Sequence, residues 1–468
     1  MKTQPKVVLS GDRVLSLADY VARGGGEGLK IAQILGPRIT AKEVSLSGLR
    51  GRGGGGFRTG RKWMSVQDAS QEGDRRYVVC NGAEGEPGTF KDRAILRHNP
   101  YQVIEGLAIA ASTIKASGAY LAVKSTFSVE IRRVESALRE MRVAGLAGDI
   151  PITLVRGPDS YLFGEEKALL EVVEGEEPLP RRDAPYLQGL FAPGPQMGWS
   201  AHATAGQDRP PAANPTVVNN VETLATVPHV LTNGPEWYRS MGTAESPGTM
   251  VFTVVGDVVH PGYEEVELGT PLGEIIERIG GGAAPGRAIK AVFSGVSNGV
   301  ISAEHLDVPA SYEGLKSIGS GLGAAGFMVY DDTADMVSVA RMFSRFLHVE
   351  SCGQCGACKI NSGEIAKTLE RLENGGADER DINNVASQLR MVTDQSRCYL
   401  PEELQVLIRS ILTAFPQDFV DHLERQLKPR RTYQLPKIVD LQGGQATYDE
   451  RINYKQPDWT YLNPPLAG

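Results

Sequence analysis

Residues 48–63 read GLRGRGGGGFRTGRKW, and this basic, glycine-rich stretch guides the interpretation of the whole chain. Seven of its sixteen residues are glycine and five are Arg or Lys. Glycine lets backbone N–H groups approach a bound group closely, because no Cβ intervenes, and Arg and Lys bind phosphate. The stretch therefore predicts a loop against a phosphorylated cofactor. The alternative is a flexible linker, but linkers favour Gly with Ser and rarely combine five cations with Phe57 and Trp63.

This loop does not fit the two common nucleotide-binding motifs. Gly51, Gly53 and Gly56 form a formal G-x-G-x-x-G match, but the Rossmann motif needs a strand directly before it, and AKEVSLSGLR is a poor strand. The Walker A pattern fails because Arg61 stands at the lysine position and Lys62 at the Ser/Thr position. A different kind of phosphate loop is expected.

Composition limits the class of protein. The chain has 468 residues, enough for several domains, and a formal net charge of −7. No basic field suggests nucleic acid, and no apolar run approaches the roughly 18 residues of a membrane span. The first residues lack the apolar core of a signal peptide, so a cytoplasmic, reducing location is expected. Four of the five cysteines cluster late in the sequence, which favours metal ligation or redox chemistry over disulfides.

The first half of the chain alternates between strand and helix patterns. The apolar run at 77–80 is followed by the glycine-rich, acidic turn NGAEGEPGTFKDR and then by a helix. This order is typical of a ligand site at the end of a parallel strand. Glu84 and Glu86 in the turn can accept hydrogen bonds from ribose hydroxyls or flavin N–H groups, or they can be solvated loop acids.

Two further segments carry candidate ligand-binding side chains. Glu165 and Glu166 precede a helix, where acids are favoured by the helix dipole alone. Alternatively, they line the same cleft as the first pair of acids, where they can disfavour an extra phosphate by repulsion. The segment NPTVVNNVETL offers the paired amides of Asn219 and Asn220.

The second half predicts a small β-rich domain and a helical bundle. Cys352, Cys355 and Cys358 form a C-x2-C-x2-C pattern, and Cys398 follows forty residues later. Three cysteines plus one favour a [4Fe–4S] cluster, because structural zinc is usually held by two separated pairs. Apolar residues recur at helical spacing on both sides of Cys398, which indicates a bundle. The proline- and aromatic-rich tail suggests an extended arm over this chain or a partner, or a disordered end.

Five motifs in this order carry a family resemblance: the loop at 48–63, the turn at 81–93, YLFGEEKALL at 161–170, PTVVNNVETL at 215–224 and ESCGQCGACK at 350–359. Together they resemble the flavin-carrying, NADH-binding subunit of respiratory complex I and the diaphorase subunits of NAD-linked hydrogenases and formate dehydrogenases. The resemblance implies an α/β Rossmann-like FMN/NADH domain, a ubiquitin-like β-grasp domain and a C-terminal helical bundle with the cluster. The expected boundaries are 1–47 for a helical lead, 48–245, 246–332, 333–427 and 428–468 for the tail.

The resemblance also implies site residues. It assigns FMN binding to Gly51, Arg52, Gly53, Lys62, Asn81, Glu84, Gly85, Gly164, Val218, Asn219, Asn220 and Thr223. NADH would be bound by Gly54, Phe57, Glu86, Glu165, Glu166 and Tyr186, with Phe57 stacking on the adenine and Glu166 disfavouring the NADPH 2′-phosphate. The cluster ligands would be Cys352, Cys355, Cys358 and Cys398. No side chain need act as acid, base or nucleophile, because the cofactors carry the chemistry.

The implied function is an NADH dehydrogenase of the diaphorase type, which passes electrons from NADH through FMN to the cluster and on to a partner. The partners would be a small thioredoxin-like [2Fe–2S] subunit and a larger redox subunit or membrane complex, which could hold this chain at the inner face of the membrane. The chain departs from the family pattern at Ala83, Gly85, Ser65, Asp183 and Tyr186. One alternative is therefore a flavin and iron–sulfur subunit that uses another donor, and another is a Rossmann dehydrogenase that uses NAD alone.

Overall fold

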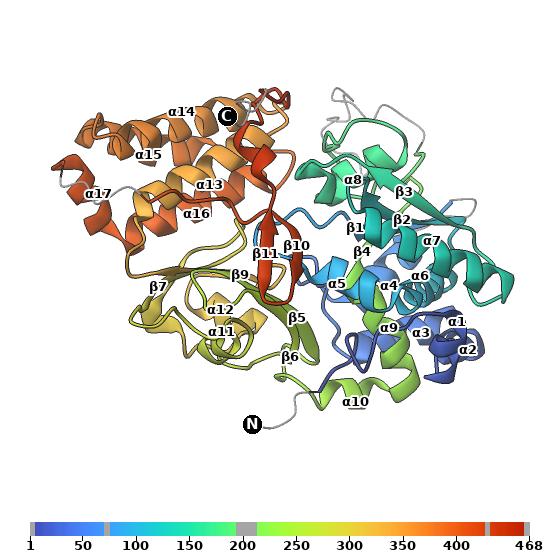
Figure 1. Ribbon diagram of the computed structural model, residues 1–468. Helices are drawn as coiled ribbons and strands as arrows, with labels where there is room; N and C mark the ends of the chain where they lie inside the picture. Colours follow the sequence, from blue (N-terminus) through green and yellow to red (C-terminus); the bar gives the residue numbers. More distant parts are fainter. Residues whose placement is uncertain (1–4, 70–74, 193–212, 426–430, 463–468) are drawn as a thin grey trace. The chain divides into compact units, whose positions relative to one another are not determined.

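The chain folds into two compact units, and the computed structural model describes residues 5–69, 75–192, 213–425 and 431–462 (Figure 1). Residues 192–213 are rich in Pro, Gly and polar residues, a composition that predicts an inserted loop, and they lie almost wholly outside these ranges. Unit 1 comprises Met1–Gly85, Lys91–Val251 and Glu264–Thr270, and unit 2 comprises Glu86–Phe90, Phe252–Tyr263 and Pro271–Gly468. Each unit is described separately.

A four-stranded parallel sheet forms the centre of unit 1. Its order is β3-β2-β1-β4, and its strands are β1 (Tyr77–Gly82), β2 (Gly118–Lys124), β3 (Ile152–Gly157) and β4 (Thr216–Asn220). The chain adds strands outward from β1 on one side and then returns to place β4 on the other. The carboxyl ends of β1 and β4 therefore form a topological switch point, which is where open α/β sheets bind ligands. The Rossmann-like α/β prediction is confirmed.

Helices accompany this sheet. They are α1 (Leu17–Ala22), α2 (Glu27–Leu35), α3 (Pro37–Leu46), α4 (Thr59–Ala69), α5 (Lys91–His98), α6 (Pro100–Ile114), α7 (Ser128–Val143), α8 (Glu166–Val173), α9 (Val221–Asn233) and α10 (Pro235–Arg239). The segment AKEVSLSGLR, a poor strand by sequence, lies mainly in α3. Helices α6 and α9 touch at Gly106, where a Cβ would lie 1.9 Å from the carbonyl oxygen of Leu224. Only glycine permits this close approach.

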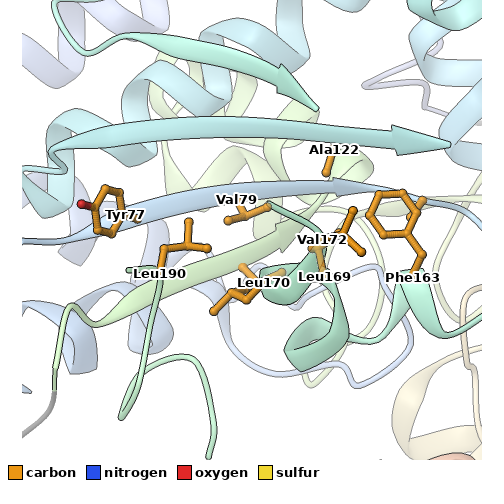
Figure 2. Close-up of a cluster of buried hydrophobic side chains, with 10 residues drawn as sticks. Tyr77, Val79, Ala122, Phe163, Leu169, Leu170, Val172 and Leu190 are labelled. Carbon is orange, nitrogen blue, oxygen red and sulfur yellow. The ribbon is translucent and has the colours of Figure 1, made fainter. Parts of the chain in front are cut away.

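Apolar side chains from α8 fix that helix against the sheet. Leu169, Leu170 and Val172 pack with Val79 of β1 and with Phe163, which lies in the short 3₁₀ turn Leu162–Gly164 (Figure 2). Phe163 and Leu169 are fully buried. Because these side chains hold the start of α8 in place, the acids at that start are fixed relative to the carboxyl ends of the strands.

Unit 2 contains most of a mixed five-stranded sheet. Its order is β6-β5-β9-β7-β8, with β5 (Thr249–Gly256), β6 (Gly262–Glu267), β7 (Ile289–Ser294), β8 (Ile301–Ser302) and β9 (Gly326–Asp331). The boundary between the units crosses β5 and β6. Strand β9 runs parallel to β5 and antiparallel to β7. Helices α11 (Leu272–Gly280) and α12 (Tyr312–Ser317) accompany the sheet, in agreement with the predicted β-grasp domain.

Helices form the next part of unit 2. They are α13 (Met336–Glu350), α14 (Gly356–Glu373), α15 (Glu379–Met391), α16 (Leu400–Ala414) and α17 (Pro416–Leu423). The predicted apolar stripes are buried: Val385 and Leu389 on α15, and Leu404, Leu407 and Ile411 on α16. The bundle prediction is therefore confirmed. Within the described ranges, no helix combines the length and apolarity needed to cross a membrane.

The described part of the tail contains regular structure. Strands β10 (Ile438–Gln442) and β11 (Gln445–Tyr448) form an antiparallel hairpin, and the 3₁₀ turn Glu450–Asn453 follows. The hairpin turn is Gly443-Gly444, and both residues have positive φ. Such φ angles are required at both centres of a type I′ hairpin turn. Of the two expectations for the tail, a disordered end is wrong for residues 431–462, which pack within unit 2.

Candidate functional site

The glycine-rich loop of unit 1 is closed by its own backbone. The amide N of Gly51 donates to the carbonyl O of Phe57 at 2.8 Å, and Arg50 Nε donates to the carbonyl O of Gly56 at the same distance. Gly54 has a φ of +119°, which favours glycine. Phe57 is 62% exposed, so its ring is available for stacking.

The loop is anchored at the switch point of the sheet by Arg52. Its backbone N donates to Thr223 Oγ1 at 2.9 Å, in the first turn of α9. Its guanidinium is fully buried and donates to Tyr238 Oη at 2.8 Å and to the Thr249 carbonyl O at 3.0 Å. The charged end of Arg52 therefore turns into the protein.

The paired asparagines bind protein groups. Asn219 Oδ1 accepts from Trp63 Nε1 at 2.7 Å, which ties β4 to α4. Asn220 Oδ1 accepts from the backbone N of Glu222 at 2.9 Å, so it caps α9. It also accepts from Lys91 Nζ at 2.9 Å, while its Nδ2 donates to Asp92 Oδ2 at 2.7 Å. These amides tie the carboxyl end of β4 to α4, α5 and α9.

A buried charge cluster joins the starts of α5 and α9, and the sequence did not predict it. Lys91 Nζ lies 2.6 Å from Asp92 Oδ1 and 3.2 Å from Glu222 Oε2. Arg93 Nε lies 2.9 Å from Glu84 Oε2, so the predicted ligand acid Glu84 has a buried cationic partner. Burial raises the pKa of the Asp92 carboxyl to about 6, against the opposing effect of the Lys91 ammonium. Burial lowers the pKa of Lys91, but Asp92 and Glu222 outweigh this and raise it.

Asn81, near the end of β1, connects this strand to the turn that precedes α8. Asn81 Nδ2 donates to the carbonyl O of Gly164 at 2.7 Å, and Asn81 Oδ1 accepts from the backbone N of Ala83 at 3.1 Å. Gly85 follows in the same turn, and Val218 of β4 is buried. The predicted residues from β1, β4, the glycine-rich loop and the α8 start therefore share one edge of the unit 1 sheet.

The acids at α8 differ in their surroundings. Glu165 caps the helix, accepting from the backbone N of Lys167 and of Ala168 at 2.9 Å each. Burial raises the pKa of Glu165 to about 7. Glu166 forms an ion pair with Lys62, with 2.9 Å between Nζ and Oε2, and the side chain of Glu166 is 39% exposed. A predicted cation of the loop and a predicted acid of α8 thus neutralise each other.

The last two predicted dinucleotide residues belong to different units. Tyr186 is 39% exposed in unit 1. Glu86 belongs to unit 2, where its Oε1 accepts from the backbone N of Val296 at 2.6 Å.

The four clustered cysteines lie at the starts of two bundle helices. Cys352 and Cys355 occupy the turn before α14, Cys358 is in its first turn, and Cys398 precedes α16. All are free thiols. Burial, with the neighbouring Cys355 and Cys352, raises the pKa of the Cys358 thiol to about 12. In the described ranges no three His, Cys, Asp or Glu side chains already have the spacing of a bound metal ion.

A hydrogen-bonded link joins the two cysteine segments. Gln354 Nε2 lies 3.7 Å from Cys352 Sγ, and Gln354 Oε1 accepts from Arg397 at 2.9 Å. Arg397 directly precedes Cys398. Gln354 therefore links the segment of the fourth cysteine to the turn that carries the other three, although forty residues separate Cys398 from Cys358 in the sequence.

Family models match both sites and the small domain between them. The Nuo51 FMN-binding domain matches residues 44–229, the SLBB domain matches 251–299, and the NADH-ubiquinone oxidoreductase-F iron–sulfur binding region matches 338–422. The fold and these sites define a redox protein that carries a flavin and an iron–sulfur cluster.

Individual proteins of similar sequence or structure show which kind of redox protein this chain resembles. The chain is 37% identical over 427 residues to the F 2 subunit of the NADH-quinone oxidoreductase of Rhizobium meliloti, covering 88% of this chain and 96% of that one. It is 34% identical to the HndC subunit of the NADP-reducing hydrogenase of Solidesulfovibrio fructosivorans, covering 88% and 82%. The structure of an H2-reduced NAD+-reducing [NiFe]-hydrogenase aligns with a TM-score of 0.74 and 31% identity, covering 89% and 67%.

The chain belongs to the family of NADH-quinone oxidoreductase F subunits. It is an NADH-oxidising subunit that binds FMN, NAD and a [4Fe–4S] cluster, as the sequence predicts. The residues present fit these groups. A Cβ on Gly54 or Gly55 would meet no atom within 4 Å, so the outer side of the loop is open to a ligand. The bundle supplies four thiols, the number that a cubane cluster requires.

Proposed function

We propose that FMN binds at the switch point between β1 and β4. The observation that carries this proposal is the 2.9 Å hydrogen bond from the Arg52 backbone to Thr223, because it joins the glycine-rich loop to the first turn of α9. The proposed FMN-binding residues are Gly51, Arg52, Gly53, Lys62, Asn81, Glu84, Gly85, Gly164, Val218, Asn219, Asn220 and Thr223. Backbone N–H groups and Lys62 supply the attraction for phosphate, while the Arg52 guanidinium anchors the loop.

NADH would bind on the open side of the loop. Gly54, Glu165, Glu166 and Tyr186 of unit 1 are the proposed contacts, and exposed Phe57 would stack on the adenine. When bound, FMN accepts a hydride and releases electrons singly, which matches a two-electron donor to a one-electron cluster. The protein supplies binding, orientation and electrostatics. Cys352, Cys355, Cys358 and Cys398 are the proposed cluster ligands.

Replacing Glu166 with alanine is expected to weaken the preference for NADH over NADPH by about tenfold, which corresponds to about 1.4 kcal/mol. The change removes a negative charge that repels the 2′-phosphate. The ratio of kcat/KM for NADH and NADPH, with ferricyanide as acceptor, measures the effect. Glu177→Ala makes the same charge change at an exposed position. Equal ratios in both variants and the unaltered protein would remove this role.

Dinucleotide affinity is expected to fall as the pH rises through about 7. Burial raises the pKa of Glu165 to about 7, so its carboxyl is neutral below that pH and ionised above it. The ionised form repels the dinucleotide diphosphate. The Kd of NAD+, measured by calorimetry, should therefore be about tenfold higher at pH 8 than at pH 6. Glu165→Gln should flatten this profile, whereas exposed Glu177→Gln should preserve it. A pH-dependent Kd in the Glu165→Gln variant would contradict the assignment.

We also propose that electrons leave the cluster for a separate subunit. Relatives named as subunits of quinone oxidoreductases and a hydrogenase support redox partners. A small thioredoxin-like [2Fe–2S] subunit and a larger redox subunit are the proposed partners. Five free cysteines support a reducing, cytoplasmic compartment, with attachment to a membrane only through those partners.

A further inference from the structure

The C-terminal segment at 450–461 packs against the end of α13. This segment is called the C-terminal strap below. Arg345 of α13 donates to three of its carbonyl oxygens, those of Ile452 at 3.2 Å, Asn453 at 2.9 Å and Lys455 at 3.0 Å. The guanidinium of Arg345 therefore binds the strap backbone between residues 452 and 455.

A buried ion pair joins the strap to Glu350, which lies two residues before Cys352 in the sequence. Lys455 Nζ lies 2.8 Å from both carboxylate oxygens of Glu350, and the two side chains are only 3% and 1% exposed. Glu350 is the last residue of α13. Trp459 Nε1 donates to the Val349 carbonyl O at 2.9 Å, and Lys455 Nζ lies 5.6 Å from the centre of the Trp459 ring. A buried charge pair is costly to separate, so this contact is specific.

Lys359 joins the strap to the cysteine turn itself. It follows Cys358 directly, and its Nζ donates to the Ser351 carbonyl O at 2.7 Å, just before Cys352. The same Nζ donates to the Pro457 carbonyl O of the strap at 2.6 Å. One ammonium group therefore connects both ends of the turn that carries three cysteines, and connects that turn to the strap.

We propose that the C-terminal strap holds the cysteine turn in its cluster-binding shape, with Lys359 as the positioning residue. The inference rests on the proposed ligand set of Cys352, Cys355, Cys358 and Cys398. Mutation of groups that orient metal ligands typically lowers metal affinity by about 10- to 100-fold. The Lys359 charge also lies next to a ligand, where it stabilises the more negative, reduced cluster. Cluster potential depends on such nearby charge.

Variants of Lys359 test the positioning role in the full chain. Lys359→Met should release iron to a chelator about tenfold faster or more, and should lower the reduction potential of the cluster in an EPR-monitored titration. Lys359→Arg, which keeps the charge and donors, should restore most of both properties. Lys367→Met is the matched control, because Lys367 lies on the same helix and is 69% exposed. It should match the unaltered chain.

Variants of the strap separate its role from the charge of Lys359. A chain that ends at Asp449 and the milder variant Trp459→Phe, which keeps an aromatic ring but loses the indole N–H donor, should both release iron faster. Iron-free chains give a second measurement, in which amide hydrogen exchange at 348–358 should increase in both variants. Unchanged iron release, exchange and potential in all these variants would overturn the proposed role of the strap. An unaltered chain that binds no iron would instead overturn the ligand set on which that role depends.

Discussion

A Cys355→Ser variant is expected to lose its iron–sulfur cluster and to keep FMN. Iron should fall from about four atoms per chain to almost none, because a cubane cluster needs four thiolates and only three would remain. FMN should stay bound, since its proposed residues are in unit 1 and the cysteines of the turn are in unit 2. Electron transfer from NADH to a one-electron partner should be lost with the cluster. Iron and flavin analysis of the same preparation measures the outcome.

Cys80→Ala is the matched control for this experiment. Cys80 is the fifth cysteine, and it is fully buried in β1 of unit 1. Burial raises the pKa of its thiol well above the usual value, so it is an inert apolar group. The Cys80→Ala chain should keep its full iron content. Normal iron and brown absorbance in the Cys355→Ser chain would contradict the ligand assignment.

Replacing Lys91 with methionine is expected to lower the free energy of unfolding by about 3–5 kcal/mol at neutral pH, because it leaves buried carboxylates without their cation. Asp92 and Glu222 lie 2.6 and 3.2 Å from the Lys91 ammonium, and all three side chains are buried. The change also frees Asn220, which caps α9, so FMN content should fall. Urea unfolding and flavin analysis provide the measurements.

The sign of the pH dependence distinguishes this electrostatic cause from simple loss of packing. Burial already raises the pKa of Asp92 to about 6, so the folded state binds this proton more tightly than the unfolded state. Without Lys91 the pKa should rise further. A carboxyl with a raised pKa contributes stability at low pH that is lost as the pH rises, so the deficit should be smaller at pH 5 than at pH 8. Exposed Lys42→Met should show neither effect. A deficit that is independent of pH would contradict the electrostatic explanation.

Sequence reasoning predicted the elements whose signals are local. The apolar run at 77–80 became β1, and the helical stripes around Cys398 became buried faces of α15 and α16. The five motifs identified the family and its cofactors. The Gly443-Gly444 pair is also a local signal, because two glycines between short strands are typical of a two-residue hairpin turn. The prolines and aromatics of the tail predict an extended arm or a disordered end and do not indicate this hairpin.

Side-chain partners that are distant in sequence could not be predicted in this way. Lys62 and Glu166 are 104 residues apart and form an ion pair that neither composition nor periodicity indicates. Arg52 looked like a phosphate ligand, yet its guanidinium donates to Tyr238, 186 residues later. The link from Lys359 to Pro457 likewise depends on where the tail packs. Periodicity predicts which face of an element is buried, but not which distant side chain meets it.

The most direct test of NADH oxidation through FMN is an anaerobic titration of the purified full chain with NADH. We expect NADH to bleach the visible flavin band, and the cluster then to give the EPR signal of its reduced form. The unaltered chain should respond to NADH as it responds to dithionite, which reduces flavin without a binding site. A flavin band that dithionite bleaches and NADH leaves unchanged would contradict this function.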